Sequence, residues 1–120
     1  MNLENIVKYL ESKLNDTEWK VDTTINEKNN QVELSLETWT PAGRDVVLEF
    51  EFKDKTTKED ISKSFQEYYD NYDVSFETYI WLDDEGHGKN GAPYEMESVL
   101  IDTQWVENEL SELAYLFENK

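Results

Sequence analysis

Apolar and polar residues follow two different spacings along the first half of the chain. Residues 2–15 place apolar side chains three and four positions apart, which predicts an amphipathic helix. Three later segments, 19–25, 32–39 and 46–52, alternate apolar and polar residues. Turn-forming residues separate them, namely Asn29-Asn30 and Pro41-Ala42-Gly43. This alternation predicts an antiparallel meander with one buried face and one face exposed to solvent.

The second half predicts two more helices and one more strand. Thr56 to Glu59 fits a capping box, which predicts a helix with a buried aromatic stripe that includes Phe65. Val74–Leu82 alternates again and predicts a fourth strand with Tyr79 and Trp81 on its outer face. The pattern leaves open whether these two aromatics pack under a loop or mark a contact surface.

A long helix is expected from about Pro93 to the end of the chain, because its apolar residues keep a helical spacing. Asp102-Thr103 is its weakest point, and the pattern leaves open whether the helix is continuous or broken there. The predicted fold is a single α+β domain over residues 1–120, in the order α-β-β-β-α-β-α. Its four-stranded, mainly antiparallel sheet would carry helices on one face.

Charge is the most unusual property of the composition. The chain has 28 acidic residues against 11 Lys and Arg, a net charge of −17, and residues 61–120 hold only three of those bases. Binding to phosphate backbones requires cations, so direct binding of nucleic acid or of an anionic membrane is not expected. The natural complement is a basic protein surface or dissolved cations. The alternative is that the charge keeps the protein in solution and has no role in binding.

The cysteine content, the length of the apolar runs and the N-terminus indicate where the protein is located. The chain has no cysteine, which excludes disulfides and thiolate metal sites. No apolar run approaches the length of a membrane span, and the N-terminus lacks the basic and apolar regions of a signal peptide. A cytoplasmic location is therefore expected.

A glycine-rich segment, 86–91, matches the spacing G-x-G-x-x-G between a predicted strand and a predicted helix. Asp83, Asp84 and Glu85 precede it and would repel a pyrophosphate, and no second parallel strand follows the helix. His87 is the single histidine, and the acidic residues around it do not have EF-hand spacing. Nucleotide binding, cofactor binding and a dedicated metal site are therefore not expected, and only weak cation binding at the surface is left open. Almost every acid lies on a predicted wet face, and no Ser or Thr has the context of a nucleophile elbow. No residue is therefore assigned a catalytic role and an enzyme is not expected, with an acidic enzyme that uses the 83–91 loop as the third alternative.

Residues 73–119 carry several recognisable positions: Asp73-Val74, Trp81, Gly88-Lys89-Asn90-Gly91, Pro93, Ile101-Asp102, Leu110, Leu113 and Ala114. With these, the C-terminal half resembles short acidic uncharacterised proteins of phages and mobile elements of Gram-positive and gut bacteria. The resemblance implies a setting in which small acidic proteins inhibit host defence, as anti-restriction and anti-CRISPR proteins do. Some such inhibitors imitate the charge of DNA.

Two functions are expected from these observations. The first is a non-enzymatic, protein-binding domain, in its most specific form an inhibitor that occupies the basic channel of a nucleic-acid-binding host enzyme. The second is a homodimeric structural or regulatory protein that buries its exposed aromatics between subunits. The predicted partner-binding residues comprise three aromatics and nine acids, with the final-helix acids expected to form a ridge: Trp39, Tyr79, Trp81, Asp83, Asp84, Glu85, Glu95, Glu97, Asp102, Glu107, Glu109 and Glu112.

Overall fold

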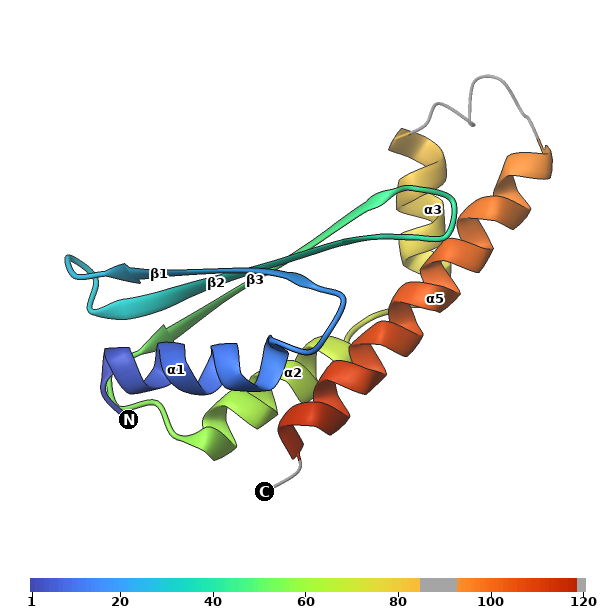
Figure 1. Cartoon of the computed structure of the whole chain (residues 1–120). Helices are drawn as coiled ribbons and strands as arrows, with labels where there is room; N and C mark the ends of the chain where they lie inside the picture. The colour runs from blue at the N-terminus through green and yellow to red at the C-terminus, as the bar shows by residue number, and fades with distance from the viewer. Residues whose placement is uncertain (85–92, 119–120) are drawn as a thin grey trace.

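The computed structural model describes residues 1–84 and 93–118, with the side chains of all of them except 84 and 93–95. Within these ranges three strands and four helices follow in the order α-β-β-β-α-α-α. The strands are β1 (Lys20–Asn26), β2 (Gln31–Trp39) and β3 (Asp45–Lys53). They form one antiparallel sheet in the order β1-β2-β3, which confirms the predicted meander (Figure 1).

One face of the sheet is buried under helices, as the alternation predicted. Figure 1 shows α1 (Leu3–Leu14), α2 (Lys58–Asp70) and the C-terminal part of α5 (Pro93–Glu118) on the same side of the strands. Their apolar stripes meet the inward residues of the sheet in one core. Its buried members are Ile6, Leu10, Leu14, Trp19, Val32, Leu34, Leu36, Val46, Leu48, Phe50, Phe52, Ile61, Phe65, Val106, Leu110, Leu113 and Phe117.

Local signals set the starts of α1 and α2. The Asn5 N–H donates to the Asn2 side chain at 2.8 Å, which makes Asn2 the predicted N-cap of α1. In α2 the capping box joins Thr57 to Asp60, one residue later than the predicted Thr56–Glu59 box. The helix expected there is confirmed, with a shifted first residue.

The predicted fourth strand is wrong, because Val74–Asp84 forms a helix, α3. The Asp73 side chain caps its first turn by accepting from the Phe76 N–H at 3.1 Å. Apolar residues occur on every side of this segment, so they fit a strand as well as a helix. Tertiary packing decides between helix and strand: Thr78 is buried against α5, and α3 packs along α5 as a helix.

The final helix is continuous. α5 runs from Pro93 to Glu118 without a break at Asp102-Thr103. The side chains of Asp102 and Thr103 form hydrogen bonds that do not interrupt the backbone hydrogen bonds of α5. The Thr103 hydroxyl donates to the Leu100 carbonyl at 3.0 Å, and the Asp102 carboxylate points away from the helix to other elements.

Candidate partner-binding surface

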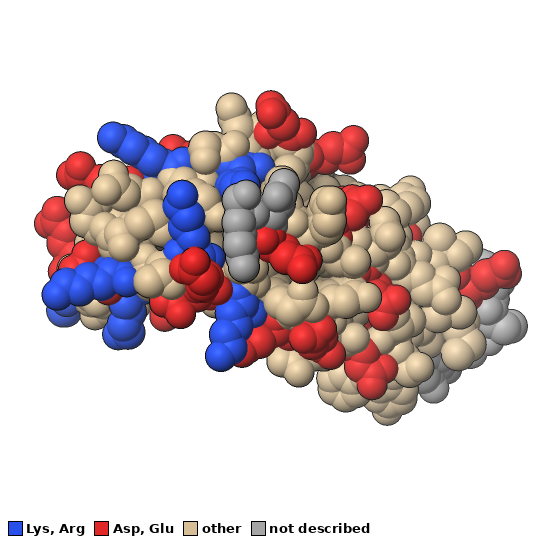
Figure 2. All heavy atoms as spheres, turned by 90° about the horizontal axis from the view of Figure 1, so that it is seen from below, with Lys and Arg blue, Asp and Glu red and all other residues tan. Residues whose placement is uncertain are grey.

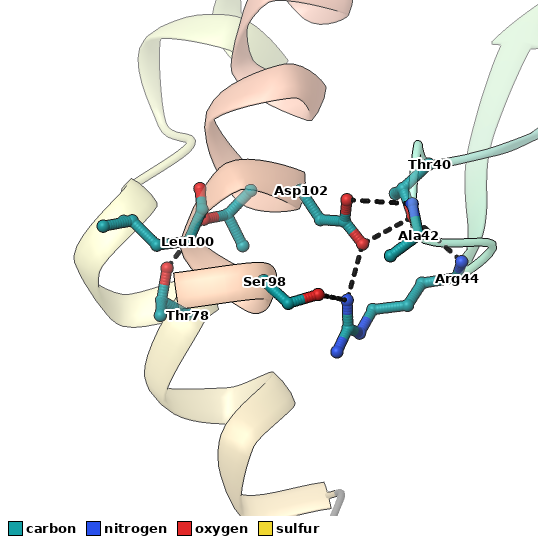
Figure 3. Close-up of polar contacts among 8 residues, drawn as sticks. Thr40, Ala42, Arg44, Thr78, Ser98, Leu100 and Asp102 are labelled. Atoms are coloured by element: carbon teal, nitrogen blue, oxygen red, sulfur yellow. Dashed lines mark hydrogen bonds and ion pairs between the residues drawn. The ribbon is translucent and has the colours of Figure 1, made fainter. Parts of the chain in front are cut away.

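A buried ion pair fixes α5 to the turn between β2 and β3. In this turn Gly43 has a φ of +89°, a left-handed conformation that favours glycine, and its N–H donates to the Thr40 carbonyl at 2.8 Å. The tight turn directs Arg44 toward α5, where its Nη1 lies 2.7 Å from the Asp102 Oδ2 (Figure 3). The Asp102 side chain is 1% exposed and that of Arg44 is 18% exposed.

Further hydrogen bonds complete this network. The Thr40 hydroxyl donates to Asp102 Oδ2 at 2.6 Å, and the Ala42 N–H donates to Oδ1 at 3.3 Å. Arg44 Nη1 also donates to the Ser98 hydroxyl at 3.2 Å (Figure 3). A buried carboxylate is tolerated only when it is paired and hydrogen-bonded in this way. Asp102 is therefore a structural anchor, and its predicted place in an exposed acidic ridge is wrong.

A second polar contact joins α3 to α5. The hydroxyls of Thr78 and Thr103 lie 2.7 Å apart, and both residues are buried. Together the two contacts position α3 and the part of α5 that precedes Thr103, which we call the arm. Figure 1 shows the arm extending away from the end of the molecule formed by α1 and α2.

The arm exposes large apolar side chains. Those exposed on α3 are Phe76, Tyr79 and Ile80, and those on α5 are Met96, Leu100 and Ile101. Tyr79 is 65% exposed, more than any other of these six. Single exposed apolar residues are ordinary, but several on two packed helices are typical of an interaction surface.

Four of these residues share one side of the arm. Asp102 on α5 and the half-buried Trp81 on α3 mark the opposite side, because Asp102 contacts the β2–β3 turn and Trp81 packs on the core. Leu100 lies across α5 from Asp102, beside α3 (Figure 3). Successive residues of a helix are rotated by about 100° around its axis. By this rotation, Met96 lies one turn before Leu100 on the same side of α5, and Tyr79 and its neighbour Phe76 lie on the same side of the arm on α3. We call Phe76, Tyr79, Met96 and Leu100 the arm patch.

The charged side chains of α3 and α5 that the structure describes are all acidic. The sequences of α3 and α5 contain no Lys or Arg, while Asp83 and Glu97 are exposed on the arm. In the view of Figure 2 the visible Lys and Arg atoms gather toward the α1–α2 end, and the visible part of the arm shows acidic and uncharged residues. Arg44, which contacts α5, is paired with Asp102 on the side of α5 opposite the arm patch. The arm is thus an apolar surface bordered by carboxylates.

The other predicted partner-binding residues do not come together. Trp39 is exposed on the outer face of the sheet, while Trp81 is partly buried against the core. Glu97 and Glu112 are exposed and Glu107 and Glu109 are half-buried. Glu107 and Glu109 lie about 200° apart around the helix axis, so the expected continuous ridge is not present among the described acids. Glu85, and the side chains of Asp84 and Glu95, lie outside the described residues.

Carboxylates gather instead on the open face of the sheet, as the strand alternation predicted. Glu33 lies opposite Glu51, and Ser35 opposite Glu49. A shallow depression of about 600 Å³ is lined by these residues together with Asp22. Asn26 and Gln31 each donate to Glu33 Oε2 at 3.2 Å, which offsets part of the repulsion between the facing carboxylates.

A second group of acids lines a groove of about 470 Å³ between α5 and the segment that links α1 to β1. Asp16, Glu18, Glu109 and Glu112 border it beside Trp19. Burial raises the pKa of the Glu109 carboxyl to about 7, with further contributions from the charge and hydrogen bond of Glu112 and the charge of Glu18. Near neutral pH, Glu109 therefore changes charge.

The raised pKa of Glu109 predicts a loss of stability as pH rises. The folded chain holds this proton up to about pH 7, whereas an unfolded chain releases it near the ordinary carboxyl pKa of 4.5. The protonated Glu109 carboxyl therefore makes its full contribution to the free energy of unfolding below pH 4.5, and this contribution is lost as the pH rises to about 7. The Glu109→Gln variant should be more stable than the parent at pH 8 by about 1 kcal/mol, after allowing for solvent screening of a partly exposed carboxyl.

Urea unfolding of both proteins between pH 5 and pH 8 measures this effect. The Glu118→Gln variant, which removes a charge from an exposed position of the same helix, is the control and should track the parent. Parallel stability curves for the parent and the Glu109→Gln variant would contradict the prediction.

The sequence missed most of the arm patch. The alternation of 74–82 predicts that Phe76 lies on the strand face opposite Tyr79 and Trp81, and the helical spacing after Pro93 places Met96 and Leu100 on the apolar stripe of the last helix. One available signal was that the apolar residues of 74–82 have no polar side at helical spacing. A helix of that kind is either enclosed on all sides or has an unpartnered apolar face.

Comparisons with protein-family models, curated proteins and solved structures give no significant match. None of the helices in the described residues has the length and apolar character needed to cross a membrane. The same residues contain no group of three or more acids, histidines or cysteines arranged to hold a metal ion. The site is therefore characterised by its own chemistry alone.

Proposed function

We propose that the protein is a non-enzymatic binding domain that docks on a basic surface of another protein through its arm. The observation that carries this proposal is the arm patch, exposed on two helices that contain acids and no Lys or Arg. Apolar anchors contribute affinity by leaving water, and the carboxylates attract a cationic partner and oppose an anionic one. Nucleic acid itself is an unsuitable ligand for such a surface.

The partner class we propose is a nucleic-acid-binding enzyme, with the carboxylates occupying positions that phosphates would take. The net charge of −17 and the resemblance to small acidic proteins of phages and mobile elements support this choice. The arm patch adds apolar contacts to the electrostatic attraction, and salt does not weaken apolar contacts as it weakens attraction between charges. Binding should therefore weaken with added salt but persist at physiological ionic strength. The absence of cysteine fits a cytoplasmic setting for this inhibitor.

Capture from a bacterial host lysate tests this function. The tagged parent is compared with a variant carrying Asp83→Asn and Glu97→Gln on the arm. The matched control carries Glu49→Gln and Glu51→Gln on the outer face of the sheet, where the side chains are also exposed. The parent and the control should retain a nucleic-acid-binding protein at physiological salt, which duplex DNA displaces, and the arm variant should lose it.

Two outcomes would count against the proposal. An equal catch by both variants would show that the arm carboxylates are not used. An empty eluate from the parent would favour an acidic surface that only maintains solubility.

A homodimer is the second candidate, because exposed apolar residues can also pair with a second copy. The like charges of two arms oppose such pairing. Sedimentation equilibrium at low and high salt distinguishes the two: a dimer that strengthens with salt and is lost with Tyr79→Ser would support it. A monomer at all concentrations and salt levels would exclude it.

A further inference from the structure

We infer that the arm patch binds an amphipathic helix of the partner, with apolar residues on one face and Lys or Arg on its borders. This inference rests on the proposed function and specifies the form of the partner. It follows from the backbone of the arm, from the spacing of the arm patch and from the charges beside it.

The backbone of the arm favours a helical ligand over an extended one. Apart from the groups at the helix ends, the N–H and C=O groups of α3 and α5 are paired inside their own helices, so the arm offers no strand edge. An extended peptide lying there would bury backbone groups without partners. A helix has its own backbone hydrogen bonds satisfied and presents only side chains to the surface.

The spacing of the arm patch matches one face of such a helix. Phe76 and Tyr79 are neighbours one turn apart on α3, and Met96 and Leu100 are one turn apart on α5. The α3 pair covers about 4.5 Å along its helix and the α5 pair about 6 Å. Apolar anchors at positions i, i+4 and i+7 of a partner helix extend about 10 Å, so two turns of that helix can contact both pairs.

The charges next to the arm patch select a basic ligand over a second copy. Asp83, one turn after Tyr79 on α3, and Glu97, beside Met96 on α5, are both exposed, so each can meet a cation of a docked helix. A second arm would bring only carboxylates to these positions, since neither α3 nor α5 contains a Lys or Arg. Like charges at an interface oppose association, whereas opposite charges favour it and set its orientation.

Synthetic peptides test the inference directly. The probe is a fluorescein-labelled helical peptide of Leu, Ala and Lys with all its Leu residues on one face. A second peptide has the same composition with Leu distributed around the helix, and a third replaces every Lys of the probe with Glu. Fluorescence anisotropy at physiological salt gives the Kd of each peptide for the full-length protein.

The variants separate the arm from the rest of the surface. One variant carries Tyr79→Ser and Leu100→Ser, both at exposed arm-patch positions. The matched control carries Trp39→Ser and Val47→Ser, which remove exposed apolar side chains from the outer face of the sheet. Circular dichroism and urea unfolding confirm that both variants are folded before binding is measured.

The probe should bind the parent about tenfold more tightly than the peptide with distributed Leu, and the acidic peptide should not bind. The arm variant should lose about tenfold in affinity, and the sheet variant should stay within about twofold of the parent. Equal losses in both variants, or equal affinities for the two basic peptides, would overturn helix docking while leaving attraction to basic partners intact. No binding of either basic peptide would contradict the proposed function as well.

Discussion

Replacing Asp102 with Ala is expected to lower the free energy of unfolding by about 3 kcal/mol. The change leaves the Arg44 guanidinium and the Thr40 hydroxyl without the carboxylate that pairs with them at 2.7 and 2.6 Å. Arg44 retains some access to water, which places the loss at the lower end of the range for broken buried pairs. The variant should also loosen the arm, because this pair joins α5 to the β2–β3 turn.

Urea unfolding measures the stability change, and hydrogen exchange of the α3 amides measures the loosening. Glu97→Gln is the control, since it removes an exposed acid from the same helix and should change stability by at most about 0.5 kcal/mol. A loss below about 1 kcal/mol for Asp102→Ala would show that the network does not hold α5 in place.

Replacing Phe65 with Ala should lower the free energy of unfolding by about 3–5 kcal/mol. The Phe65 side chain is 2% exposed and lies between two other rings. Its ring centroid is 4.2 Å from that of Phe117 on α5 and 4.5 Å from that of Phe50 on β3. The substitution removes contacts from three elements and leaves a cavity where the sheet, α2 and α5 meet.

Thermal and urea unfolding with a Tyr115→Ala control measure this effect. Tyr115 is an aromatic residue on α5 that is 72% exposed, so its removal should have little consequence. Similar losses in the two variants would contradict the central position of Phe65. The Phe65→Ala variant must still unfold in one cooperative transition, because only then can its free energy of unfolding be compared with that of the parent.

The anchor and the arm patch have complementary roles in the proposed function. Asp102 and Thr103 are adjacent in α5 but point in different directions, the first to the β2–β3 turn and the second to Thr78 of α3. This arrangement holds the arm patch on two helices fixed to the sheet. A fixed apolar surface loses less conformational entropy on binding than a mobile one.

Much of the fold could be predicted from short-range patterns. The period-two alternation of 32–39 and 46–52 identified β2 and β3, since all but one of the inward residues of these segments are apolar and reach the core. The spacing of Ile6, Leu10 and Leu14 identified α1 in the same way. These patterns are reliable because each repeats several times within one element that has one wet and one dry face.

The sequence by itself determined the meander, three of the four described helices, the buried faces of the sheet and of α1, and an acidic C-terminal half. Only the tertiary structure decided that 74–84 is a helix, because its apolar residues satisfy either period and the contact with α5 selects one. Only the tertiary structure showed that Asp102 is buried and not part of the acidic surface, because its partner Arg44 lies 58 residues away in the sequence. Local spacing shows which residues share a face, whereas what that face meets depends on contacts between distant segments.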